Sequence, residues 1–332
     1  MVNETAALSG TPVLIVGDMV ADVYLDGRIS RISREAPVLV LEQMEERVVA
    51  GGAANVVNNA ATLGGTAYAV GVVGDDASGD SLLRVLGEHR VQTAGFVRDA
   101  DRPTVTKTRI IAGGRATVSQ QIVRVDREWH TPLSAETEEA LLSHIRTLLP
   151  QVRGAVLSDY GSGTVTERVA RMVIDETRTA GIPSIVDSRY DILRYEGVGY
   201  VKQNDAELAA ALGRELRTDA DIHAAGHELC RRLNAEGVLI TRGADGMTLF
   251  LADGTATDIP VSDRSEIYDV SGAGDTCVAV MILALAAGIA PAHAARLSNY
   301  ASGIAVRKYG TATVSQEELC AAVAAAEGEC GC

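Results

Sequence analysis

Aromatic residues are scarce in this sequence, basic residues are fewer than acidic ones, and no long apolar segment occurs. Only 4% of the 332 residues are Phe, Trp or Tyr, which argues against a surface that stacks the bases of single-stranded nucleic acid. The formal net charge of −14 opposes attraction to DNA and to anionic membranes. No apolar run reaches the length of a membrane span. We therefore expect neither a nucleic-acid partner nor a membrane partner.

Signals for export are also lacking. Residues 1–12 contain neither a basic start nor an apolar run, so no signal peptide is expected. The five cysteines form an odd set without the spacing of a zinc site, as expected in a reducing compartment. We predict a cytoplasmic protein, and we interpret Cys330 and Cys332 as part of a frayed chain end.

Short apolar segments alternate with amphipathic segments along most of the chain. The predicted buried strands are residues 13–16, 67–73, 155–157, 184–186, 238–241 and 247–251. The predicted helices are residues 51–63, 78–86, 135–149, 164–180, 276–287, 292–306 and 316–326. Residues 276–287 are apolar on nearly all sides, which is typical of a helix buried inside a domain. This alternation predicts a single α/β domain over residues 1–332, with a doubly wound, mostly parallel sheet and helices on both faces.

Two segments break this alternation. Residues 23–43 and 104–125 are rich in alternating β-type residues and carry few helix signals. We interpret them as a small β-sheet that projects from the main domain and forms a lid over a cleft. Val38, Val40 and Ile111 alternate with polar neighbours, so one face of this sheet is expected to be apolar and to need burial.

The strongest local signal for chemistry lies at residues 269–276, at the start of the buried helix. Residues 271–274 are all small, so the backbone can turn tightly and point several N–H groups at one spot, where the helix N-terminus adds positive potential. A transferring phosphoryl group suits this position, and Asp275 at its edge can accept the proton of an attacking hydroxyl. Alternatively, Ser271 and Asp275 only cap the helix.

Two common nucleotide-binding motifs are missing from the sequence. No G-x-x-x-x-G-K-[ST] segment occurs, which argues against a P-loop. The first predicted strand leads into residues 17–22, Gly-Asp-Met-Val-Ala-Asp, rather than into G-x-G-x-x-G. A nicotinamide-binding dehydrogenase is therefore not favoured.

Three motifs resemble those of the PfkB or ribokinase-like carbohydrate kinases and occur in the order found in that family. Residues 51–55, Gly-Gly-Ala-Ala-Asn, continued at 71–76 and Gly79, are similar to the N-terminal signature. Residues 272–275, Gly-Ala-Gly-Asp, resemble the C-terminal signature of that family. Residues 204–207, Asn-Asp-Ala-Glu, match its Asn-x-x-Glu motif, which is linked to magnesium and phosphate. The resemblance implies a ribokinase-like fold, ATP and Mg²⁺ as cofactors, and Asp275 as the catalytic base.

Within that superfamily the chain most resembles the heptose 7-phosphate kinases of lipopolysaccharide precursor synthesis. The similar segments are Gly17-Asp18 with Asp22, residues 30–38, Thr106-Lys107-Thr108-Arg109, Gln120-Gln121, Arg124 with Asp126, and Ser158-Asp159-Tyr160-Gly161. The resemblance implies phosphorylation of the anomeric C1 hydroxyl of a sugar that already carries a terminal phosphate.

The chain also departs from the family pattern. Residues 187–189 read Asp-Ser-Arg where Asp-Pro-Lys is usual, and residues 202–204 read Lys-Gln-Asn where Lys-Pro-Asn is usual. The aromatic stretch that usually follows Asp22 is reduced to Val23-Tyr24-Leu25. These departures leave the identity of the sugar open.

The resemblance implies roles for further residues, each of which has a plain structural alternative as a turn residue or a helix-start residue. It implies sugar binding by Asp22, Gly51, Gly52 and Asn55; an anion hole at Gly272, Ala273 and Gly274; nucleotide binding by Asn204, Thr241, Gly243 and Gly246; a Mg²⁺ contact through water at Glu207; and a monovalent cation such as K⁺ at Asp269. Lys107, Arg109 and Arg124 in the lid can grip the substrate's phosphate, although they equally fit a solvated strand face.

Two alternative functions remain open at this point. One is a PfkB-family kinase for another sugar, such as a ketohexose, a pentose or a nucleoside. The other is a catalytically silent sensor of sugar or nucleotide, against which the intact Asp275 and the Asn204-x-x-Glu207 motif argue. The expected partners are ATP and a small sugar phosphate. Because related sugar kinases clasp two lids together, the resemblance also implies a homodimer joined through the lid.

Overall fold

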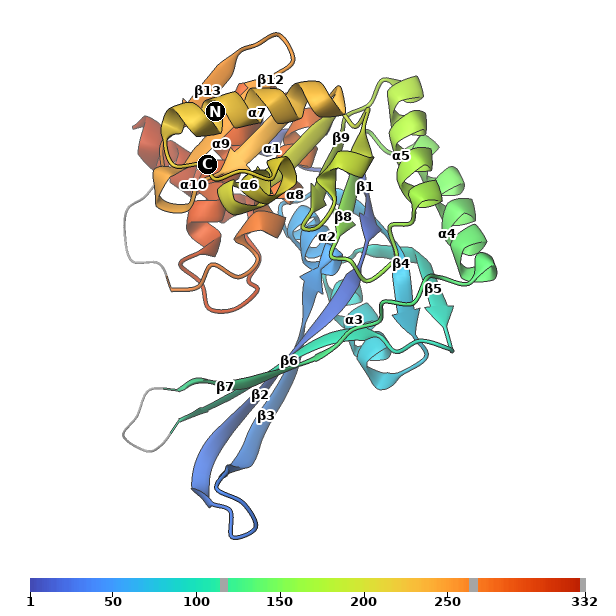
Figure 1. Cartoon of the computed structure of the whole chain (residues 1–332), viewed down its shortest axis with the longest axis vertical. Coiled ribbons are helices and arrows are strands. Elements are labelled where there is room, and N and C mark those ends of the chain that lie inside the picture. Colours follow the sequence, from blue (N-terminus) through green and yellow to red (C-terminus); the bar gives the residue numbers. More distant parts are fainter. Residues whose placement is uncertain (114–118, 263–267, 329–332) are drawn as a thin grey trace.

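A nine-stranded sheet forms the centre of the main body in the computed structural model, which describes residues 1–113, 119–262 and 268–328 (Figure 1). Its strand order is β13-β12-β11-β10-β9-β8-β1-β4-β5. The strands are β1 (Pro12–Gly17), β4 (Thr66–Gly74), β5 (Gln92–Asp99), β8 (Ala155–Asp159), β9 (Ser184–Ser188), β10 (Tyr200–Asn204), β11 (Gly237–Thr241), β12 (Met247–Leu251) and β13 (Ala256–Ile259). All neighbours from β11 to β5 pair in parallel, whereas β12 and β13 are antiparallel. The predicted mostly parallel sheet is confirmed.

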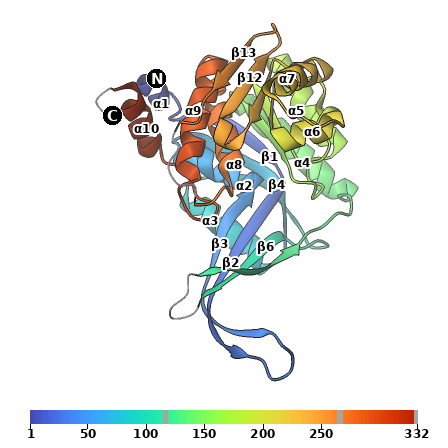
Figure 2. The same ribbon diagram turned by 60° about the vertical axis from the view of Figure 1, so that its left-hand side comes forward.

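Helices cover both faces of this sheet (Figure 2). One face carries α1 (Val2–Ala6), α2 (Ala53–Thr62), α3 (Ala77–Glu88), α8 (Ala273–Ala286), α9 (Pro291–Ala305) and α10 (Gln316–Glu327), and the other carries α4 (Ala135–Leu148), α5 (Glu167–Ala180), α6 (Asp205–Leu212) and α7 (Asp219–Leu233). Both faces of strand β1 are buried, so its residues are apolar without alternation. Val13 and Ile15 pack into one hydrophobic cluster, and Leu14 and Val16 pack into the other.

Helix α8 begins earlier than the sequence predicts. Residues 277–284 are buried on all sides, as expected from their composition. The helix starts at Ala273 because Gly272, with φ +79°, turns the chain into it without the cost that a side chain would add in that conformation. Asp275 therefore lies in the first helical turn and not before it.

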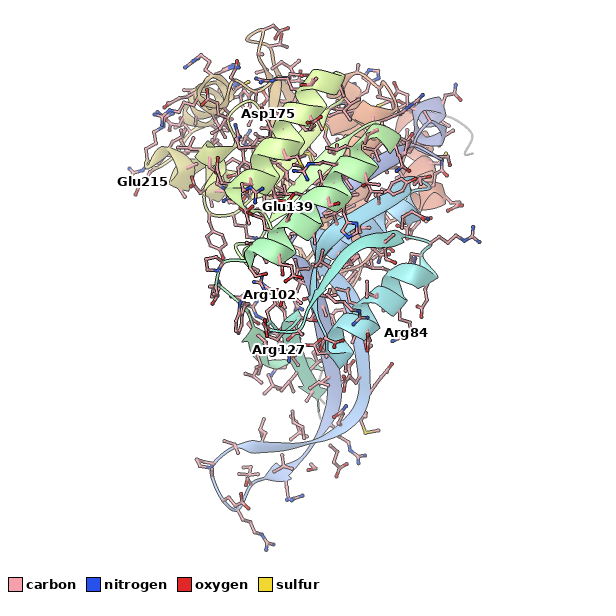
Figure 3. All side chains as sticks on the ribbon, turned by 90° about the vertical axis from the view of Figure 1, so that its right-hand side faces the viewer. Arg84, Arg102, Arg127, Glu139, Asp175 and Glu215 are labelled. Atoms are coloured by element: carbon pink, nitrogen blue, oxygen red, sulfur yellow. The ribbon has the colours of Figure 1, made fainter. Side chains whose placement is uncertain are left out.

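A second, four-stranded sheet projects from the body (Figures 1 and 3). This small sheet has the order β3-β2-β6-β7, from β2 (Met19–Ile32), β3 (Leu39–Gly52), β6 (Val105–Gly113) and β7 (Gln120–Arg127). Strands β2 and β6 pair in parallel, and the other pairs are antiparallel. Compared with the predicted ranges 23–43 and 104–125, β2 begins earlier, at Met19, and β3 and β7 end later, at Gly52 and Arg127. Strand β2 follows β1 almost directly, and β3 leads directly into α2.

The base of the small sheet is tied to the start of α3 by one carboxylate. Asp76 accepts hydrogen bonds from the Thr104 backbone N–H at 3.0 Å and from the Thr104 hydroxyl at 2.7 Å. Arg127, labelled in Figure 3 at the end of β7, lies 3.5 Å from the same carboxylate. One expectation about this sheet is wrong: Ile111 needs no partner to cover it, because it is already buried within the chain.

Several elements were not predicted from the sequence, among them β5, β10, α6, α7 and β13. Strand β10 contains the buried polar residues Lys202 and Gln203, which interrupt the apolar run that marks a strand. Cys230 and Cys277 are buried free thiols. Across the described ranges, no helix has both the length and the apolar character that a membrane crossing requires.

Candidate active site

Asp275 is held by two hydrogen-bond donors from distant parts of the chain. The Asn55 side-chain amide donates to Asp275 Oδ2 at 2.8 Å, and the Tyr160 hydroxyl donates to Oδ1 at 2.6 Å. The N-cap residue of α8 is Gly272, and it makes no side-chain capping bond. The carboxylate is therefore not a helix cap, which was the alternative interpretation of this residue.

Burial dominates the electrostatics of Asp275. Removal from water raises the pKa of this carboxyl from 3.8 to about 6, although the hydrogen bonds from Tyr160 and Asn55 act in the opposite direction. The nearby Asp187 raises this pKa further, and Lys202 lowers it. A carboxyl group with a pKa near 6 is largely ionised at neutral pH and is basic enough to accept a proton.

The glycine turn before Asp275 lets two side chains approach the backbone closely. A Cβ atom at position 272 would lie 2.7 Å from Asn55 Nδ2, and one at position 274 would lie 2.8 Å from Lys202 Nζ. The predicted anion hole of Gly272, Ala273 and Gly274 thus combines the N-terminus of α8 with a buried ammonium group. Both contribute positive potential at one point.

Lys202 and Asp187 form a buried ion pair beside this turn, which sequence reasoning missed. Lys202 Nζ lies 3.0 Å from Asp187 Oδ2, and the two residues come from the neighbouring strands β10 and β9. Burial opposes the charge of Lys202, but the attraction of Asp187 together with that of Glu207 outweighs it and holds the pKa of the ammonium above its usual range. A charged residue near the carboxyl end of each of two adjacent strands was the signal that could have identified the pair.

A cavity of about 850 Å³ opens in front of Asp275. It is lined by residues 270–275 and by Asp187, Arg189 and Lys202. Its lining also includes residues 241 and 243–247 and residues of α9. The cavity thus joins the predicted anion hole to the predicted nucleotide-binding loop.

Asn204 and Glu207 have a definite structural role at the start of α6. The Asn204 side chain accepts from the Glu207 backbone N–H at 2.7 Å, and the Glu207 carboxylate accepts from the Asn204 N–H at 2.8 Å. This reciprocal pair is a capping box. Both residues also line the cavity, so the same motif that starts the helix places a carboxylate at the cavity wall.

The predicted nucleotide-binding loop follows β11. Thr241, Gly243 and Gly246 all line the cavity. Gly246 has φ +85°, and a Cβ atom there would lie 2.1 Å from the Ile259 carbonyl oxygen, so only glycine fits this turn.

The predicted sugar-binding residues meet where the small sheet joins the body. The buried Asp22 carboxylate lies 2.8 Å from Arg109 Nη1. The parallel pairing of β2 with β6 places the two residues close together on neighbouring strands. A Cβ atom at Gly51 would lie 2.7 Å from the same carboxylate. Gly52 has φ +55° and forms the N-cap of α2, the helix that carries Asn55.

The other two cations of the small sheet are placed differently. Lys107 lies 3.6 Å from Glu128 and 6.0 Å from the ring centre of Tyr160, so it faces the site. Arg124 makes a bidentate pair with Asp126 at 2.8 and 2.9 Å in an exposed position. The structure thus brings Lys107 and Arg109 to the site but leaves Arg124 beside its own counterion.

Asp269 joins two segments of backbone near the site. Its carboxylate accepts hydrogen bonds from the N–H groups of Ser271 at 2.9 Å and Gly310 at 3.0 Å. These contacts brace the turn that leads to Asp275. The predicted role in holding a monovalent cation is a separate question and stays a prediction.

Comparison with known proteins gives both a family and a fold. The pfkB family of carbohydrate kinases matches residues 11–318. A curated relative named bifunctional protein HldE from Paramagnetospirillum magneticum is 41% identical over 324 residues, which are 97% of this chain and 65% of that protein. The protein of the same name from Geobacter metallireducens is 41% identical over 92% of this chain and 61% of its own length. The chain therefore spans less than two thirds of these relatives.

Solved structures support the same fold. The Arabidopsis thaliana ribokinase complexed with ribose and ATP has a TM-score of 0.73 and 19% identity, over 95% of this chain and 99% of that one. Phosphofructokinase-2 from Escherichia coli in complex with substrates and products has a TM-score of 0.76 and 21% identity, over 96% and 99% of the two chains. The predicted ribokinase-like fold is thus confirmed. Since the family match covers nearly the whole sequence, the chain belongs to the pfkB family of carbohydrate kinases and is a phosphotransferase acting on a sugar.

Proposed function

We propose that this kinase transfers the γ-phosphate of ATP to the anomeric C1 hydroxyl of a heptose 7-phosphate, with Asp275 as the base. The observation that carries the proposal is the place of the Asp275 carboxylate: it lines the cavity and accepts a hydrogen bond from Tyr160, whose ring lies 6.0 Å from Lys107 of the small sheet. The motifs at residues 30–38 and 106–109 and the 41% identity to proteins named HldE favour a heptose over another sugar.

The chemistry follows from the groups around the turn. The acceptor hydroxyl gives its proton to Asp275 as its oxygen forms a bond to the γ-phosphorus, and the bond from that phosphorus to the β-γ bridging oxygen breaks to release ADP. The N–H groups at residues 272–275 and the Lys202 ammonium stabilise the charge on the transferring group. ATP occupies the cavity, with its nucleoside end at residues 241–247.

The wall of the cavity fits a magnesium ion held mainly by water and phosphate. Among the described residues no cluster of three or more His, Cys, Asp or Glu side chains could hold a metal. Mg²⁺ needs no such cluster, because it commonly uses one or two carboxylates, substrate phosphates and several waters. Glu207 and Asn204 would hold the ion, which supplies neutralisation of phosphate charge when bound.

The substrate's terminal phosphate would bind at the small sheet, which acts as a lid. Lys107 and Arg109 face the site, and Arg124 lies on the neighbouring strand opposite Arg109. A phosphate that draws Arg109 toward itself leaves Asp22 able to accept a sugar hydroxyl. Asn55 and the Gly51-Gly52 turn would complete the sugar pocket, and closure of the lid would exclude water from the reaction.

Two further parts of the proposal concern ions and assembly. We assign Asp269, next to the backbone of the turn, as the place where K⁺ would act. We also propose that two chains pair through their small sheets and that the reaction takes place in the cytoplasm. Exposed apolar side chains at Val38, Val123 and Val125 on the small sheet support the pairing.

A screen of acceptors that measures ADP release tests the proposal. Heptose 7-phosphate is expected to be the best acceptor among heptose 7-phosphate, hexose phosphates, pentoses, nucleosides and free sugars. A higher kcat/KM for a ketohexose or a nucleoside would move the assignment to another member of the family. No ADP release with any acceptor would favour a sensor of sugar or nucleotide.

A further inference from the structure

Tyr160 contacts the proposed base although the mechanism above assigns it no role. It follows directly after β8, and its hydroxyl donates to Asp275 Oδ1 at 2.6 Å across 115 residues of sequence. Asn55 binds the other oxygen. An ionised carboxylate has about four acceptor positions, so these two bonds leave positions free for an incoming hydroxyl.

The backbone that carries Tyr160 is fixed by the buried Asp18. Its Oδ2 accepts from the N–H groups of Tyr160 at 2.8 Å and Ser162 at 3.0 Å, and its Oδ1 accepts from Thr164 at 3.0 Å. Asp159 adds a bond from the Gly161 N–H at 3.0 Å. A loop held by four such bonds can place a side chain with little freedom.

The ring of Tyr160 is fixed by contacts of its own. The Arg189 guanidinium lies 4.6 Å from the ring centre, and the Lys107 ammonium of the small sheet lies 6.0 Å from it. Burial, together with the negative charges of Asp275 and Asp187, holds the pKa of Tyr160 well above its usual value near 10. The phenol therefore keeps its proton at working pH and acts only as a donor toward the carboxylate.

We propose that Tyr160 is a positioning residue of the phosphoryl transfer, whose phenol holds the Asp275 carboxylate in the orientation that presents a free lone pair to the acceptor hydroxyl. The inference rests on the proposed role of Asp275 as the base. Replacement of Tyr160 by Phe removes one oxygen atom and keeps a ring for the contacts with Arg189 and Lys107. The remaining bond from Asn55 allows the carboxylate to rotate.

The charged groups that face Asp275 do not change in this variant. Asp187 on β9 and Lys202 on β10 form an ion pair with each other, and Arg189 follows β9. On α8 itself the neighbouring titratable group is Cys277, whose pKa burial raises to about 11, so it stays neutral. A change in the titration of Asp275 therefore reports the loss of the phenol.

The experiment compares the full-length wild type with Tyr160→Phe. The pKa of Asp275 is followed by ¹³C NMR of the carboxyl carbon without substrate, with the signal assigned from Asp275→Asn. We expect this pKa to rise by about one unit, since a hydrogen bond that lowers it is lost. We also expect kcat to fall about 10- to 100-fold, while the KM for ATP stays within about threefold.

Tyr200→Phe is the matched control. The Tyr200 hydroxyl, at the start of β10, donates a hydrogen bond to the Glu236 carboxylate, so this variant loses the same kind of phenol-to-carboxylate bond without touching Asp275 or the loop that carries Tyr160. It is expected to lower the melting temperature and to leave the Asp275 titration unchanged. An unchanged Asp275 pKa in Tyr160→Phe, or a kcat within twofold of the wild type, overturns the proposal. A wild type that phosphorylates no sugar refutes the proposed function instead, and the NMR titration then still decides whether Tyr160 holds the carboxylate.

Discussion

The Asn55 amide lies 2.8 Å from the Asp275 carboxylate, although 220 residues separate them in the sequence. Each residue belongs to the first turn of a helix that begins at a glycine, α2 after Gly52 and α8 after Gly272. Asn59 reinforces the contact, because its amide donates to Asn55 Oδ1 at 3.1 Å and its own oxygen accepts from Thr276 at 3.2 Å. Two motifs from opposite ends of the chain thus form one site.

Replacement of Asp275 by Asn is expected to abolish most turnover. The amide keeps the shape of the side chain but cannot accept the proton of the acceptor hydroxyl. Loss of a general base typically lowers the rate on the order of 10²–10⁴-fold. The KM for ATP should remain within a few-fold, because the cavity that binds the nucleotide is unchanged. Steady-state kinetics decide the matter, and near-normal turnover in this variant would show that Asp275 is not the base.

The pH dependence of activity should reflect the raised pKa of Asp275. Because the base must be ionised to accept a proton, activity should increase as the pH rises through the pKa of about 6. The acid limb of kcat/KM for the sugar phosphate is therefore expected near pH 6. An acid limb near pH 4, the ordinary range of an Asp, would mean that water reaches this carboxylate in the active enzyme. Sugar phosphates titrate near the same pH, so a phosphonate analogue of the acceptor with a different pKa serves as the control.

Lys202 offers a way to separate stability from catalysis. Its replacement by Met leaves Asp187 buried without a partner, which is expected to cost about 3–5 kcal/mol of unfolding free energy. Turnover should also fall, because one positive charge beside Gly274 is lost. The double variant with Asp187→Asn should recover much of the stability but not the turnover. Recovery of both would mean that Lys202 serves only to balance Asp187.

Local motifs in the sequence predicted part of the candidate site. Glycines precede both Asp275 and Asn55 in short motifs that the sequence shows directly. Gly272 and Gly52 have positive φ angles, which explains why glycine occupies these two positions. The ion pair of Lys202 with Asp187 was not predictable, because it depends on which strands become neighbours. A charged side chain is tolerated in the interior only when an oppositely charged partner lies beside it, and no local sequence pattern shows which residue that partner is.

The same reason explains two contacts that no local pattern predicts. Arg109 was expected to face a substrate phosphate, and its contact with Asp22 arises from the parallel pairing of β2 with β6. The contact of Tyr160 with Asp275 likewise depends on the packing of α8 against the sheet. Residues 104–125 were predicted as part of the small sheet, but 114–118 lie outside the described residues.

The cations of the small sheet should recognise a phosphate on the acceptor. Lys107→Met and Arg109→Met are each expected to raise the KM for the acceptor about 10-fold or more, since hydrogen bonds to a charged group are lost. Arg124→Met should have a smaller effect, because Arg124 is exposed and pairs with Asp126. The KM for ATP should change less than about threefold. Arg28→Met is the control, because Arg28 lies farther along β2 and pairs with Glu42. If the best acceptor is a sugar without phosphate, this prediction and the heptose 7-phosphate assignment are both wrong.

Assembly through the small sheet is the last prediction. Apolar side chains that are 44–68% exposed gather on this sheet, at Ile32, Val38, Leu39, Met44, Val123 and Val125. A projecting sheet with exposed edges and an apolar surface is usually covered by another chain or by the protein's own body. Light scattering at micromolar concentration should therefore give about twice the chain mass of 34.8 kDa. Val123→Asp with Val125→Asp should give a monomer of the chain mass, whereas Leu193→Asp, at an exposed site on the body, should not. A wild-type monomer with full activity would contradict the pairing, and the small sheet would then act within a single chain.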